Sequence, residues 1–150
     1  MGPVCWSKQR ADNDRRAETG GMIVDLPFDG VSMDIRCERR GNTIHVNIPQ
    51  HVVHHSPDGF EWGYGGSGPA DFALNILDLF APSVLWDSEP VECFRGRCSQ
   101  FAWDHHQEFK REFIATLPRD GGVIHGDTIR SWINIVRGGQ LVQCFMEVLA

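Results

Sequence analysis

The residues best placed to do chemistry gather in one glycine-rich stretch, Phe60–Asp71, where Ser67 stands between glycines and Pro69 follows. Backbone N–H groups of such a turn attract anions, and the dipole of a following helix adds to this attraction. The stretch is best interpreted as a structural loop, with a phosphate or carboxylate site as the alternative interpretation. It lacks the Lys-Ser/Thr pair of a P-loop and the G-x-S-x-G nucleophile turn, so we expect no catalytic residue here. No Lys or Arg lies nearby in the sequence.

The second candidate group is a set of histidines on either side of this stretch: His51, His54, His55, His105 and His106. With a carboxylate such as Asp58 or Asp104, they would supply the ligands of a zinc site. Their spacing matches no established zinc motif, so we expect no metal ion and no cofactor. The competing interpretation is that His55 only hydrogen-bonds the turn before the glycines.

Composition favours one soluble globular domain of 150 residues, with 41% hydrophobic and 23% charged residues. The net charge of −6 argues against non-specific nucleic-acid binding, which requires Lys and Arg to neutralise phosphates. No apolar run approaches membrane-spanning length. The five cysteines are odd in number, and the first twenty residues lack the apolar core of a signal peptide. We therefore expect reduced thiols and a cytoplasmic location.

Acidic residues dominate the middle of the chain, since no Lys or Arg occurs between Arg40 and Arg95. The carboxylates of this span belong to Asp58, Glu61, Asp71, Asp78, Asp87, Glu89 and Glu92. They indicate either a solvated acidic face or a surface that meets a basic partner or mimics a phosphate chain. Among such acidic neighbours, four aromatic residues favour an aromatic core or a protein interface over stacking on nucleic-acid bases: Trp62, Tyr64, Trp103 and Trp132.

Strands are predicted in the first third of the chain. Residues 22–26 form a short strand candidate, and period-two alternation over 31–38 and 43–48 predicts a β-hairpin. His45 falls on the polar face of this hairpin, so we expect it to be exposed. Later in the chain, residues 120–122 are typical of a turn.

Three amphipathic helices are predicted, beginning at Pro69, near Asp104 and at Asp127. We expect the third to stop at Gly138–Gly139. A shorter helix is slightly favoured over a strand for the tail that follows. Residues 81–100 are expected to be a long loop. In the first helix the polar residues form a stripe opposite the apolar arc, which we expect to face water: Asp71, Asn75 and Asp78.

The expected fold is α+β, with a small antiparallel β-hairpin or three-stranded sheet packed against about three helices. The residues divide into a tail, 1–20, whose mixed charges and few apolar residues offer little surface to bury, and a single domain, 21–150.

The segment His55–Leu74 resembles the signature of a small uncharacterised bacterial family found on phages, plasmids and other mobile elements. The signature reads H-S-P-x-G-F-x-W-G-Y-G-G-S-G-P-x-x-L-A-L, and weaker similarity extends over roughly Asp25–Ile135. Phe72 departs from it, at a position where the family more often has leucine. The family has no settled activity, so the resemblance implies a genomic setting and no reaction.

The leading hypothesis is a non-enzymatic accessory protein of a mobile element that binds a protein partner, with inhibition of a host defence system as one purpose. The expected binding residues lie in the glycine stretch and just before it: Trp62, Tyr64, Gly65, Gly66, Ser67, Gly68 and His55. The alternative is a binder of small molecules or nucleotide phosphates, with or without hydrolysis, that uses Ser67, the loop amides and His55. The sequence gives neither the partner nor the oligomeric state.

Overall fold

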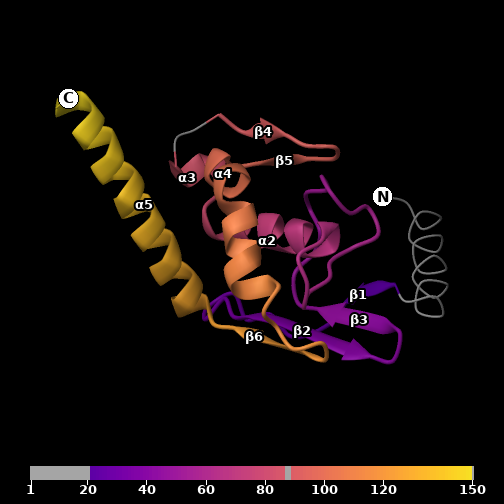
Figure 1. The fold of residues 1–150 in the computed structure, drawn as a ribbon. Coiled ribbons are helices and arrows are strands. Elements are labelled where there is room, and N and C mark those ends of the chain that lie inside the picture. The colour runs from indigo at the N-terminus through magenta and orange to yellow at the C-terminus, as the bar shows by residue number, and fades with distance from the viewer. Residues whose placement is uncertain (1–20, 87–88, 150) are drawn as a thin grey trace.

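The computed structural model describes residues 21–86 and 89–149, so the prediction for residues 1–20 lies outside the described part. The predicted α+β class is confirmed (Figure 1). The strands are β1 (Met22–Val24), β2 (Ile35–Arg40), β3 (Thr43–Val46), β4 (Val91–Glu92), β5 (Arg97–Cys98) and β6 (Gly121–Ile124). The helices are α2 (Ser67–Phe80), α3 (Ser83–Trp86), α4 (Gln100–Phe109), the π-helix η1 (Lys110–Ile114) and α5 (Gly126–Leu149).

The main sheet has four strands in the order β1-β3-β2-β6. The predicted hairpin is confirmed: β2 and β3 pair antiparallel, and Gly41 takes the positive φ of 61° that a two-residue turn requires. β1 runs parallel to β3, which the expected antiparallel sheet did not include.

The sheet is one strand wider than expected because residues 121–124 form β6, where the sequence indicated a turn. The glycine at position 121 has a φ of 112°, and a side chain there would collide with the backbone of Cys37 on β2. Gly121 therefore allows the close pairing of two strands that are far apart in the sequence.

One face of the sheet is covered by α2, α4 and η1 (Figure 1). Alternate strand residues such as Ile35 and Val46 point into this core, where they meet Phe72 and Leu77 of α2 and Phe109 of α4. This packing holds α2 against the sheet, with the glycine stretch at its N-terminal end.

The expected exposure of His45 is wrong, because its side chain is buried. β3 is an inner strand, and the carboxylate of Asp25, just after β1, lies 2.8 Å from Nδ1 of the ring. An inner strand has neighbours on both sides, so a polar residue on its second face can still be enclosed.

The second predicted helix begins four residues earlier than expected. Ser99 is the N-cap of α4, and its side chain accepts a hydrogen bond from the N–H of Ala102 at 3.0 Å. Asp104 is therefore inside the helix rather than at its start. At its C-terminal end α4 continues into η1, where the N–H of Ala115 donates to the carbonyl of Lys110.

Two predictions for the remaining segments are wrong. The helix α5 does not stop at Gly138–Gly139 but continues to Leu149, running away from the sheet (Figure 1). Residues 81–100, expected as a loop, contain α3 and the hairpin of β4 and β5. No helix in the part of the chain that the structure describes is long and apolar enough to cross a membrane.

Candidate functional site

The polar edge of α2 consists of Asp71, Asn75 and Asp78. Asp71 and Asn75 are buried and Asp78 is half-buried, which contradicts the expected exposed stripe. Asp71 is 0% exposed, and its carboxylate accepts hydrogen bonds from the backbone N–H groups of His54, His55 and Ser56 at 2.9–3.1 Å. The side-chain amide of Gln50 donates a further bond at 3.0 Å. A buried carboxylate needs such donors, and here they come from the irregular segment before the glycines.

The next two polar residues of α2 continue this role. Asn75 is 0% exposed, accepts the N–H of Val52 at 2.9 Å and donates to the carbonyl of Val52 at 2.8 Å. Asp78 accepts from the N–H of Ser99 and contacts the ring of His51, both at 2.7 Å. Through these hydrogen bonds, the three side chains hold residues 50–56 and the start of α4 against α2.

The acidic middle of the chain consequently forms no continuous acidic face among the described residues. Asp71 and Asp78 are engaged inside the fold, and Glu61 forms a bidentate ion pair with Arg39, with its shortest N–O distance at 2.6 Å. Asp58, Glu89 and Glu92 are exposed, and Asp87 lies outside the described part of the chain. Internal hydrogen bonding, and not a basic partner, explains the most buried of these carboxylates.

The segment 50–56, held in this way, brings His55 into contact with His106 of α4, with 3.0 Å between their Nε2 atoms. Nδ1 of His106 lies 2.8 Å from the carbonyl oxygen of Trp103. A carbonyl only accepts, so His106 is protonated on Nδ1, and its Nε2 accepts the hydrogen that His55 Nε2 donates. Burial lowers the pKa of both rings, which favours this neutral pair.

The other histidines do not complete a metal site with this pair. The ring of His54 packs edge-on against Trp103, with 4.6 Å between centroids, and its buried Nδ1 has no hydrogen-bond partner among the described residues. Nδ1 of His105 lies 3.7 Å from the carboxylate of Glu108. Across the described residues, no three His, Cys, Asp or Glu side chains could hold a metal ion. The zinc alternative therefore lacks its three converging ligands there.

Trp62, predicted to contact a partner, is a core residue. Its side chain is 2% exposed, and its indole N–H donates to the carbonyl of Arg119 at 3.0 Å. The guanidinium of Arg39 lies 4.9 Å from the ring centroid. Directly after it, the N–H of Gly63 donates to the carbonyl of Ile114 at the end of η1. The glycine stretch is therefore anchored on the core at its N-terminal end.

The other predicted loop residues differ in exposure. Tyr64 is 52% exposed, and its ring covers Gly66 so closely that a side chain at that glycine would collide with it. Gly65 has open space around it. Ser67 is exposed at the first position of α2, whereas Gly68 is buried, and a side chain there would collide with the Cβ of Glu61. Close contacts at both ends hold this loop in one shape.

The predicted anion site at Ser67 has one backbone donor fewer than most helix N-termini. Pro69 is the third residue of α2, so it removes one of the N–H groups that a helix normally leaves open there. Ala70, the next residue, donates its N–H to the carbonyl of Gly66. His55 points elsewhere: its ring is engaged with His106, and no hydrogen bond joins it to Ser67 in the described chain. Among the residues that the structure describes, no hydrogen bond pairs a nucleophile with a base at this loop.

The sequence analysis missed a hollow beside Tyr64. It has a volume of about 240 Å³ and is lined by Arg39, Glu61, Trp62, Gly63, Tyr64 and Arg119. Two arginines thus reach the loop from β2 and from the turn before β6, although none is near it in the sequence. Only the pairing of β2 with β6 brings them together.

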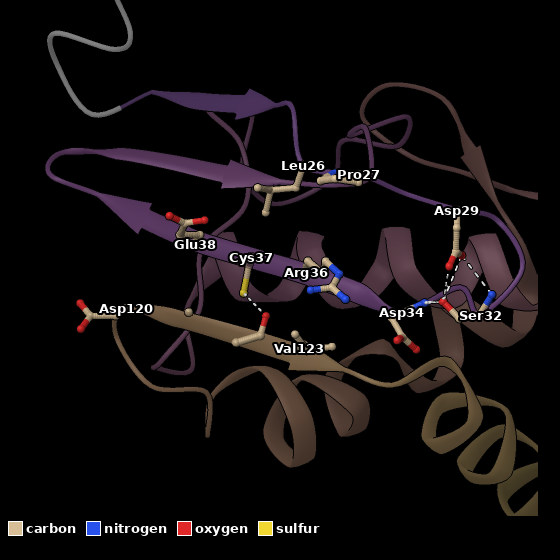
Figure 2. Close-up of a pocket in the computed structure, with 12 residues that line it drawn as sticks. Leu26, Pro27, Asp29, Ser32, Asp34, Arg36, Cys37, Glu38, Asp120 and Val123 are labelled. Atoms are coloured by element: carbon tan, nitrogen blue, oxygen red, sulfur yellow. Dashed lines mark hydrogen bonds between the residues drawn. The ribbon is translucent and has the colours of Figure 1, made fainter.

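A larger hollow, about 510 Å³, lies on the sheet face that the helices leave open (Figure 2). Arg36 lies near its middle, with Asp29, Ser32 and Asp34 at one end. The Asp29 carboxylate accepts bonds from Ser32, and Asp34 accepts the N–H of Gly126 at 2.8 Å. These carboxylates hold the local backbone, and no residue of the predicted site lies in this hollow.

Residues 30–89, which contain β2, β3, the glycine stretch and α2, match the model of a family of unknown function, DUF6166. No curated protein and no solved structure matches the chain. The match covers the segment on which the resemblance rests, and it assigns no activity to it.

Proposed function

We propose that this is a non-enzymatic protein that binds another protein through the exposed part of the glycine stretch. We define this Tyr64 surface as Gly63, Tyr64, Gly65 and Ser67 together with the hollow formed by Arg39, Glu61 and Arg119. The setting we propose is the cytoplasm, as an accessory protein of a mobile genetic element, in line with the resemblance of His55–Leu74. Inhibition of a host defence system is one purpose that fits this setting.

The observation that carries the proposal is a half-exposed tyrosine on a loop fixed at both ends. Trp62 and Gly63 are bonded to the core before it, and Gly68 packs against Glu61 after it. A fixed loop loses little conformational freedom when a partner binds, and tyrosine supplies a large amphipathic contact at low entropic cost. Tyrosine is also enriched among the residues that dominate binding energy.

The neighbouring hollow supports the same function. It places charged groups around an aromatic residue, as in a protein interface with a polar rim. Because Glu61 already neutralises Arg39, the hollow favours a polar or acidic partner side chain directed at Arg119 over a strongly basic one. This replaces the basic partner considered from composition.

The test is a pull-down with the wild type, a Tyr64→Ala variant and a matched Phe94→Ala variant. Phe94 is 70% exposed on the β4–β5 hairpin, so it controls for loss of an exposed aromatic ring elsewhere. We expect a partner to be captured by the wild type and Phe94→Ala but not by Tyr64→Ala. With the purified partner, Tyr64→Ala should weaken binding about 30-fold, as for a residue worth about 2 kcal/mol.

Folding is checked first by thermal denaturation, where Tyr64→Ala should match the wild type. Trp62→Ala is unsuitable because it would open the core. Equal capture by all three variants would exclude the Tyr64 surface as the binding site.

A second function, binding of an anionic small molecule, is favoured by Arg119 at the same hollow. The probes are inorganic phosphate and ATP, titrated by calorimetry against the wild type and Arg119→Ala. Saturable binding that Arg119→Ala abolishes would support this alternative. Absence of heat at millimolar ligand would reject it without affecting the protein-binding proposal.

A further inference from the structure

Two cysteines lie in contact on the small β4–β5 hairpin, far from the glycine stretch in the sequence. The Sγ atoms of Cys93 and Cys98 are 3.6 Å apart, and both residues are free thiols. Cys98 is 1% exposed, whereas Cys93 is half-buried and precedes the exposed tip residue Phe94. Cys37, the third free thiol described, sits on β2 beside Gly122.

The hairpin backbone holds this arrangement. Val91 pairs with Cys98, and the N–H of Cys93 donates to the carbonyl of Gly96 at 3.1 Å. At the tip, Arg95 exchanges two backbone hydrogen bonds with Val53 at 2.8 and 2.9 Å. The two sulfurs therefore stay together while the chain around them is fixed on the body of the protein.

We propose that Cys93 and Cys98 are a reversible modification site, in which a small disulfide such as oxidised glutathione converts the two thiols into an intramolecular disulfide. The sulfurs need to approach from 3.6 Å to about 2.05 Å, a shift that side-chain rotation of the partly exposed Cys93 can supply. The site is independent of the proposed binding function.

Exposure fixes the order of the steps. The Cys93 thiolate attacks one sulfur of glutathione disulfide, forms a mixed disulfide and releases one glutathione thiolate. Cys98, too buried to meet glutathione directly, then attacks the Cys93 sulfur as a thiolate and releases the second glutathione. Two protein thiols are oxidised, one glutathione disulfide is reduced to two thiols, and the two protons pass to the released thiolates.

The reaction is expected to be slow at neutral pH. Burial raises the pKa of the Cys93 thiol and of the Cys98 thiol, which lowers the fraction of reactive thiolate. The rate should therefore increase between pH 7 and pH 9.

The experiment incubates the full chain with glutathione disulfide, blocks remaining thiols with N-ethylmaleimide and maps the peptides by mass spectrometry. In the wild type we expect a Cys93–Cys98 linkage with the loss of two hydrogens. Cys37 should carry no glutathione and form no disulfide. Cys98→Ala should stop at glutathionylated Cys93, and Cys93→Ser should react at neither position. Dithiothreitol should restore both thiols.

Alkylation of both cysteines in the treated wild type, or linkage of Cys93 to Cys5 or Cys144, would overturn the proposal. Because Cys98→Ala alters a buried position, its fold is compared with the wild type by circular dichroism, and Cys93→Ser provides the test at a more accessible one. The variant Tyr64→Ala should oxidise like the wild type, which separates this result from the outcome of the binding experiments.

Discussion

The polar edge of α2 and the glycine stretch before it are adjacent in the sequence but differ in which side chains they bury. Asp71, Asn75 and Asp78 turn their polar atoms inward, and their partners are mostly backbone groups of residues 52–56 and 99. The glycine stretch buries its aromatic Trp62 and leaves Tyr64 outside. Polarity thus does not decide which residues of this region meet solvent.

What decides it is whether a hydrogen-bond partner or a packing partner is available. The Asp71 carboxylate is enclosed because three N–H groups converge on it. Tyr64 stays outside because its ring lies directly against Gly66, which leaves no space beneath it. A binding surface is therefore better sought at the unenclosed aromatic residue than at the conspicuous carboxylates.

The largest effect is expected from Asp71→Ala, which leaves the three N–H groups of residues 54–56 without acceptors. We expect a loss of about 3 kcal/mol or more in the free energy of unfolding, measured by urea denaturation. Asp71→Asn keeps one acceptor oxygen and should lose less. The control Asp58→Asn, at an exposed carboxylate, should stay within about 0.5 kcal/mol of the wild type. Equal stability of Asp71→Ala and the control would mean that the polar edge is not structural.

A smaller effect is expected from Gly68→Ala, because its new methyl group would lie 2.7 Å from the Cβ of Glu61. A Cβ atom cannot move aside without its backbone, so we expect a loss of about 1–3 kcal/mol. Gly65→Ala is the matched control, with open space around it, and should change stability by about 0.5 kcal/mol at most. If both substitutions behave alike, the glycine stretch is not held by close packing at its C-terminal end.

The smallest effect concerns pH and the His55–His106 pair. Burial lowers the pKa of both rings in the folded protein, whereas in the unfolded chain each ring has a pKa of about 6.5. The unfolded state therefore binds more protons just below that pH, so the stability due to the neutral pair is present above it and is lost as the pH falls.

We expect the urea midpoint to fall from pH 7.5 to pH 5.5, and to fall less in a His55→Gln, His106→Gln double variant. His51→Gln, which removes a ring bound to Asp78 and outside the pair, serves as the control. A fall in the double variant equal to that of the wild type would show that the pair carries no such linkage.

Local patterns in the sequence were sufficient for the hairpin and for α2. Period-two alternation predicted the hairpin of β2 and β3, and helical spacing placed α2 within two residues of its start. The confirmed α+β class follows from these elements. Both signals depend on neighbouring residues alone, so no knowledge of the tertiary contacts was needed.

Three of the failures share a different cause, since each of them depends on a partner distant in the sequence. β6 exists because Gly121 and Gly122 fit against β2, some eighty residues earlier. The burial of Asp71 depends on N–H groups of an irregular segment, which carry no sequence signature. Similarly, Arg39 and Arg119 meet beside Tyr64 only after β2 and β6 have paired.

The π-helix η1 makes the position of the glycine stretch depend on the number of residues in a neighbouring helix. Its hydrogen bond from Ala115 to Lys110 spans five residues where an α-helix spans four. Deleting one residue from 110–114 would restore regular winding and rotate the following chain by about 100° relative to α4. The carbonyl of Ile114, which holds the N–H of Gly63, would move with it. Single-residue insertions and deletions in this segment should therefore be tolerated less well than exchanges of its exposed side chains.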